Sequence, residues 1–163
     1  MSTTESPKKI QWLPLIICIA IPLAIGITAA YFTDAKSAWY LGLNKPSFNP
    51  PDWLFAPVWT ILYILMGISS YLMWEKNDES ILFYKARTVY VMQLIANFGW
   101  SYIFFYKHMV LGGMLIIVFL LALIITCIVY FKKYSTTAAW LLVPYLLWVC
   151  FATLLNYSLI TLN

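Results

Sequence analysis

Five long stretches of this chain contain no charged residue, and they limit what it can fold into. A helix rises 1.5 Å per residue, so about 20 apolar residues cross a hydrocarbon core about 30 Å thick. Only helices and closed barrels satisfy their backbone in lipid, and these stretches lack the alternation of barrel strands. We therefore predict an all-α membrane protein, a bundle of five transmembrane helices. The uncharged stretches are 10–33, 53–74, 88–106, 109–131 and 134–163.

Short charged segments separate these stretches and place the helix ends. The first stretch follows Lys8 and Lys9 but is too long for the apolar region of a signal peptide, so we interpret it as a retained span. The chain is then a single domain, 1–163, with a long first loop at 34–52. The expected helices cover about 11–33, 53–74, 81–106, 109–132 and 135–161.

The basic residues predict an orientation in the membrane. With five spans, seven of them share the N-terminal side and three lie on the other. The positive-inside rule then places the N-terminus inside, and the first loop and the C-terminus outside. The N-terminal side carries Lys8, Lys9, Lys76, Lys85, Arg87, Lys132 and Lys133, whereas the other side carries Lys36, Lys45 and Lys107.

Composition and motifs exclude several classes of function. Charged residues make up 10% of the chain, against about 25% in soluble domains, and the net charge of +4 forms no basic stripe for nucleic acid. The stretches hold no Asp, Glu, Lys, Arg or His, which disfavours proton relays and ion-coupled pumps. No catalytic motif occurs, and Cys18, Cys127 and Cys150 lack metal spacing. We expect no metal and no required cofactor.

Polar and aromatic residues recur on single helix faces. Gln93, Asn97 and Ser101 lie four residues apart, as do Trp59 and Tyr63. One interpretation is interhelical hydrogen bonding and aromatic packing, which membrane bundles commonly use. The other is a mostly apolar cavity whose tryptophans and tyrosines stack on a flat ligand. Such a ligand could enter from the lipid.

The segment 39–59 contains four prolines and three tryptophans, more rigidity and aromatic area than a linker needs. Prolines restrict the residues before them to extended conformations, so 39–52 is expected to be a stiff rim or lid, or else an anchor of the loop at the membrane interface. Pro57 is tolerated only in the first turn of a helix. The second helix therefore begins near Ala56, or it begins at Trp53 and is kinked.

Three segments resemble, in order, the motifs of the translocator protein (TspO) family, the tryptophan-rich sensory proteins and peripheral benzodiazepine receptors. They are WYLGLNKPSFNPPDWLFAPVWTILYILMG (39–67), QLIANFGWSYIFF (93–105) and VPYLLWVCFATLLN (143–156). Pro22 and GITAAYF (26–32) also resemble the family's first helix. The resemblance implies a five-helix bundle, usually a homodimer, in a bacterial cell membrane, with a cavity open toward the first loop.

The resemblance also implies ligands and site residues. Family members bind porphyrins, cholesterol in animals, and isoquinoline-carboxamide or benzodiazepine drugs. Here Tyr157 is followed by no basic residue, so the animal cholesterol pattern is incomplete and we do not expect cholesterol as the native ligand. The expected ligand is a porphyrin such as protoporphyrin or haem. The implied ligand-binding residues are Ala30, Thr33, Phe55, Ala56, Val58, Trp59, Trp148, Ala152 and Leu155, with Asn97, Trp100 and Ser101 added from the shared helix face.

Three functions follow from this reasoning. The first is a membrane receptor, sensor or carrier for porphyrin-type tetrapyrroles. The second is light- or oxygen-dependent porphyrin breakdown, for which Trp53, Trp59, Trp140 and Trp148 are the candidate residues. The third is a transporter of hydrophobic ligands, which the lack of a paired inverted repeat and of ion-coupling residues disfavours.

Overall fold

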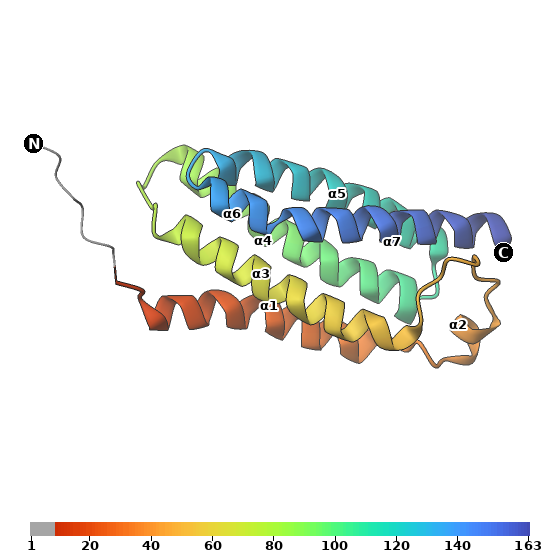
Figure 1. The fold of residues 1–163 in the computed structure, drawn as a ribbon. Coiled ribbons are helices and arrows are strands. Elements are labelled where there is room, and N and C mark those ends of the chain that lie inside the picture. The colour runs from red at the N-terminus through yellow and green to blue at the C-terminus, as the bar shows by residue number, and fades with distance from the viewer. Residues whose placement is uncertain (1–8) are drawn as a thin grey trace, which may run out of the picture.

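The computed structural model describes residues 9–163, and Lys8, which the orientation prediction counts, lies outside them. Every regular element of the described part is helical, and the long helices run side by side in an elongated bundle (Figure 1). The elements are α1 (Trp12–Phe32), α2 (Ala38–Gly42), the 3-10 turn η1 (Asp52–Leu54), α3 (Phe55–Trp74), α4 (Ile81–Ser101), the π-helix η2 (Tyr102–Tyr106), α5 (Val110–Lys132), α6 (Thr136–Leu141) and α7 (Val143–Leu162).

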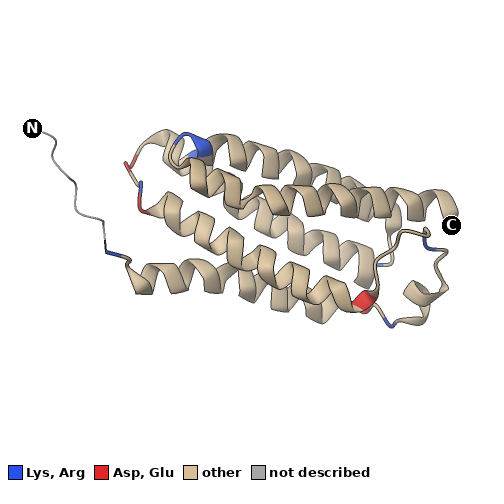
Figure 2. Cartoon of the chain, viewed as in Figure 1, with Lys and Arg blue, Asp and Glu red and all other residues tan. Residues whose placement is uncertain are grey.

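Four helical segments within 9–163 are long and apolar enough to cross a membrane, namely Trp12–Phe32, Asp52–Trp74, Val110–Lys132 and Thr136–Leu162. α4 has a comparable length of 21 residues but carries Lys85 and Arg87 in its first turns. Charged residues gather at the two ends of the bundle, and its middle is almost free of them (Figure 2). The chain is therefore an all-helical membrane protein, and the fifth span stays a prediction.

Local sequence explains where the helices begin and break. Pro57 lies in the first turn of α3, which follows η1, because proline needs no partner there for its missing N–H. The expected helix 135–161 is divided at Leu142, and Pro144 starts the second piece, α7. The first loop holds a short helix, α2, capped by the Ser37 hydroxyl, which accepts a hydrogen bond from the Tyr40 N–H.

Close contact between α1 and α3 depends on Gly67. A β-carbon at Gly67 would overlap the Ile19 Cα and lie 2.8 Å from the Cys18 carbonyl oxygen. That carbonyl has no helical partner, because Pro22 stands four residues later and lacks an N–H. The unpaired Cys18 carbonyl oxygen therefore faces Gly67, which leaves space for it because it has no side chain. Gly67 and Gly113, which packs against Phe104, serve contacts within the chain.

The first loop is held against the end of α7. The Asn44 backbone N–H donates to the Asn163 side-chain oxygen at 2.8 Å, and the Asn163 amide donates back to the Asn44 carbonyl at 3.1 Å. Nearby, the Trp39 ring stacks on His108 at 4.4 Å between centroids. These contacts join α2 to the bundle and fix one wall of the cavity described next.

Candidate ligand cavity

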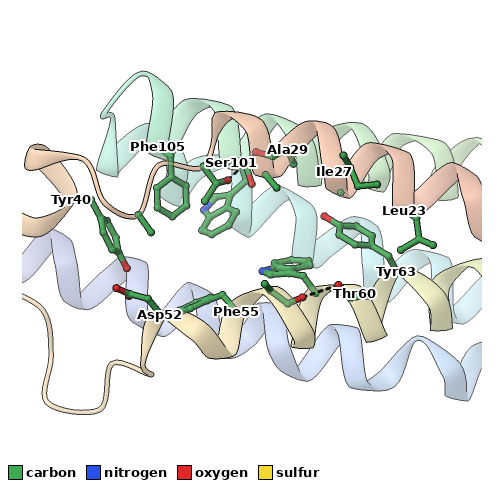
Figure 3. A pocket seen from close by; sticks show the side chains of 17 residues that line it. Leu23, Ile27, Ala29, Tyr40, Asp52, Phe55, Thr60, Tyr63, Ser101 and Phe105 are labelled. Carbon is green, nitrogen blue, oxygen red and sulfur yellow. Dashed lines mark hydrogen bonds between the residues drawn. The ribbon is translucent and has the colours of Figure 1, made fainter.

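A cavity of about 350 Å³ lies between α1 and α3, in the half of the bundle nearest the first loop. Side chains of both helices point into it, with α4 and η2 behind and α2 at one end (Figure 3). Its walls are mostly apolar, as in small-molecule sites generally. The lining residues are Leu23, Gly26, Ile27, Ala29, Ala30, Thr33, Ala35, Tyr40, Asp52, Phe55, Ala56, Trp59, Thr60, Tyr63, Trp100, Ser101 and Phe105.

Aromatic rings from α3, α4 and η2 form the inner wall of the cavity. Trp59 and Tyr63, one turn apart on α3, stack at 5.5 Å between centroids with 27° between their planes. Trp100 meets Phe105 edge to face at 6.0 Å. Rings fixed in this way offer flat faces and edges to a ligand at little entropic cost.

The Tyr63 ring can pack directly against α1 because Gly26 has no side chain. The Tyr63 ring occupies the space that a β-carbon of Gly26 would fill. Its hydroxyl donates to the Asn97 Oδ1 at 2.6 Å, and the Asn97 amide donates to the Tyr145 hydroxyl at 3.2 Å. Asn97 is fully buried, and this network joins α3, α4 and α7. The hydrogen-bonding capacity of the cavity floor is thus largely used by the protein itself.

The two threonine hydroxyls of the lining are also satisfied locally. The Thr33 hydroxyl donates to the Ala29 carbonyl at 2.9 Å, and the Thr60 hydroxyl donates to the Ala56 carbonyl at 2.9 Å. In contrast, the Trp100 indole N–H is buried without a protein acceptor. The cavity therefore offers a ligand mainly apolar contact.

Asp52 supplies the only charged side chain among the lining residues. It lies at the loop end of the cavity, where the Tyr40 hydroxyl is directed toward its carboxylate (Figure 3). Burial, together with the negative charge of Asp52, raises the pKa of Tyr40, so this phenol is neutral at physiological pH. The cavity thus has a negative pole at its loop end.

The cavity is open along the seam between α1 and α3. Ile27 and Ala30 of α1, and Ala56 and Thr60 of α3, line it and are also exposed on the outer surface. Small side chains at Ala30 and Ala56 leave this seam unfilled. Since both helices are long and apolar enough to cross a membrane, we infer that this seam faces the lipid.

Comparison with known proteins identifies the family. The model of the TspO/MBR family matches residues 18–162. The chain belongs to this family. It is 42% identical to the tryptophan-rich protein TspO of Chlorobaculum tepidum over 158 residues, which cover 94% of this chain and 98% of that protein. It is 41% identical to the protein of the same name from Archaeoglobus fulgidus (93% and 97% covered) and 33% identical to the translocator protein of Sus scrofa (90% and 88% covered).

Only some of the residues predicted for the ligand site line the cavity. Those on α1 and most of those on α3 and α4 come together in the cavity: Ala30, Thr33, Phe55, Ala56, Trp59, Trp100 and Ser101. Val58, Asn97, Trp148, Ala152 and Leu155 are not among its lining residues. Asn97 lies behind the wall and holds Tyr63, whereas Ala152 and Leu155 are buried in the bundle.

Trp148 lies outside the cavity because α7 packs chiefly on α5, whereas α1 is the main partner of α3. Its ring meets Phe55 edge to face at 5.8 Å. Of the other candidate tryptophans, Trp53 and Trp140 are 73% and 67% exposed and face outward. Trp59 is thus the one candidate for a redox role that contacts the cavity.

Several lining residues were not predicted from the sequence. Tyr40 and Asp52 come from the first loop, and Phe105 comes from the π-helix, whose wider turn ends α4. Gly26 lies in the matched first-helix segment, but its role depends on a contact with Tyr63 that no local pattern reveals. Tyr63 shares its helix face with Trp59, and that four-residue spacing was the available signal.

Residues 9–163 contain no cluster of His, Cys, Asp or Glu able to hold a metal ion.

Proposed function

We propose that this protein is a membrane receptor or carrier that binds porphyrin-type tetrapyrroles and other flat hydrophobic ligands between α1 and α3. The lining carries this proposal, because aromatic rings surround a cavity with a single charged side chain. Flat apolar rings stack well on such walls. The volume of about 350 Å³ also falls within the roughly 300–1,000 Å³ of ligand pockets. Membership of the TspO/MBR family supports the same function.

A titration of the purified protein with protoporphyrin tests the proposal. We expect saturable quenching of tryptophan fluorescence, and roughly tenfold weaker binding for Trp59→Ala, because truncating a central aromatic contact typically costs at least about 2 kcal/mol. Trp140→Ala removes an exposed tryptophan outside the cavity and should bind as the wild type does. Absence of saturable quenching would refute the proposal, as would equal affinities of the two variants.

The position of Trp59 favours a second candidate, light- or oxygen-dependent breakdown of the bound porphyrin. Trp59 lines the cavity and stacks on Tyr63, so an excited ligand would contact a readily oxidised ring. Illumination of the porphyrin complex in air should then cause a loss of porphyrin absorbance that Trp59→Phe abolishes. Decay at the same rate in this variant would reject the mechanism and leave the binding function untouched.

A further inference from the structure

The charges around the cavity are distributed unevenly. Asp52 is the only charged residue in the lining, and it stands at the start of η1, immediately before α3. The free N–H groups at a helix start interact favourably with a negative charge, so a carboxylate suits this position. No Lys, Arg or His side chain lines the cavity to balance it.

The basic residues of the first loop lie outside the lining. The Lys45 ammonium group sits 3.9 Å above the Tyr40 ring, and Tyr40 itself lines the cavity and is buried. Lys36 is exposed and its backbone N–H donates to the Asp34 carboxylate. A ligand in the cavity therefore meets the Asp52 carboxylate directly.

Asp52 is exposed to solvent, which screens part of its charge, but the ligand that it faces lies beside apolar walls. Charges interact more strongly beside low-dielectric walls than in bulk water. A carboxylate of the ligand near Asp52 would be repelled, whereas an uncharged edge would not be, and a protonated amine would be attracted. The effect is largest for groups at the loop end of the cavity, where Asp52 lies (Figure 3).

We propose that Asp52 determines the charge preference of this cavity, which selects flat ring systems whose loop-facing edge is uncharged or cationic over those with free carboxylates. The proposal rests on the proposed function, since it assumes that a flat ligand occupies the cavity. Within the tetrapyrrole class it names the preferred members: rings with esterified or amine-bearing side chains rather than free diacids.

Three porphyrins that share one ring system test the proposal: protoporphyrin, its dimethyl ester, and its diamide with a terminal amine on each arm. Dissociation constants are measured by tryptophan quenching for the wild type and for Asp52→Asn. In the wild type we expect the diamine to bind tightest and the diacid weakest. In Asp52→Asn we expect the ratio of diacid to diamine dissociation constants to fall roughly three- to tenfold, with the ester unchanged, as for partly solvated charge pairs.

Asp34→Asn is the matched control, because Asp34, like Asp52, is an exposed carboxylate near the first loop but does not line the cavity. It should leave the ratio as in the wild type. A second measurement on the wild type avoids reliance on a variant that folds poorly: the ratio should shrink as salt rises from 50 mM to 500 mM. A ratio unaffected by Asp52→Asn, or an effect equal in Asp34→Asn, would overturn the proposal. Failure of all three porphyrins to bind would instead overturn the proposed function.

Discussion

Asn97 shows how one buried amide organises the floor of the cavity. It accepts a hydrogen bond from the Tyr63 hydroxyl at 2.6 Å and donates to the Tyr145 hydroxyl at 3.2 Å. The backbone of Gly26 lies directly against the Tyr63 ring. The Tyr63 ring is therefore positioned by the hydrogen bond at its hydroxyl and by close contact with a residue that has no side chain.

Replacing Asn97 by Leu should destabilise the bundle. The substitution keeps the number and branching of the side-chain heavy atoms but leaves two buried hydroxyls without their partner, at a cost of about 1–3 kcal/mol for each unsatisfied group. The melting temperature in detergent should fall, and ligand affinity should fall with it because Tyr63 loses its anchor.

Tyr63→Phe is a milder change, because it leaves one buried atom, the Asn97 Oδ1, without a partner in place of two hydroxyls. Its melting temperature should fall less than that of Asn97→Leu. An Asn97→Leu protein as stable as the wild type would show that the network does not hold the cavity wall.

At the scale of the elements, α1 and α3 pack closely in the middle of the bundle and leave a seam nearer the first loop. Gly67 allows contact with Ile19 and with the unpaired carbonyl of Cys18, whereas Ala30 and Ala56 flank the open seam. α1 contributes only two buried residues, Pro22 and Ala29, so its position depends strongly on the close contacts at Gly67 and Gly26.

Gly67→Ala should therefore lower the melting temperature markedly. The new methyl group would overlap the Ile19 backbone, and overpacking of this kind typically costs about 1–3 kcal/mol. Gly99→Ala is the matched control, because a β-carbon there meets nothing within 4 Å and alanine favours a helix by about 1 kcal/mol. Equal melting temperatures for the two variants would contradict the proposed role of Gly67.

At the scale of the whole molecule, composition is enough to predict some features of the fold, whereas others depend on packing. Long uncharged stretches are enough to predict the long helices, because lipid forces the backbone of a span to bond within itself. The short helix α2 and the π-helix η2 meet where Trp39 packs on Phe104 and Tyr40 packs on Phe105, and local patterns do not reveal such contacts. Motif resemblance found the α1 and α3 walls of the cavity. It also implied residues of α7, a helix that packs chiefly on α5, and these do not line the cavity.

The open seam between α1 and α3 makes the surrounding membrane a reservoir for the ligand. An apolar ligand that reaches Ala30 and Ala56 from the lipid responds to its mole fraction in the bilayer, not to its total concentration in water. We expect the apparent dissociation constant to rise in proportion to the amount of lipid when protein and aqueous volume are held fixed. Titrations in liposomes at several lipid-to-protein ratios measure this, and an apparent constant independent of lipid would show that the membrane is not the reservoir of the ligand. Association constants that refer to the aqueous ligand concentration can then be compared between ligands only after each constant is divided by the membrane partition coefficient of its ligand.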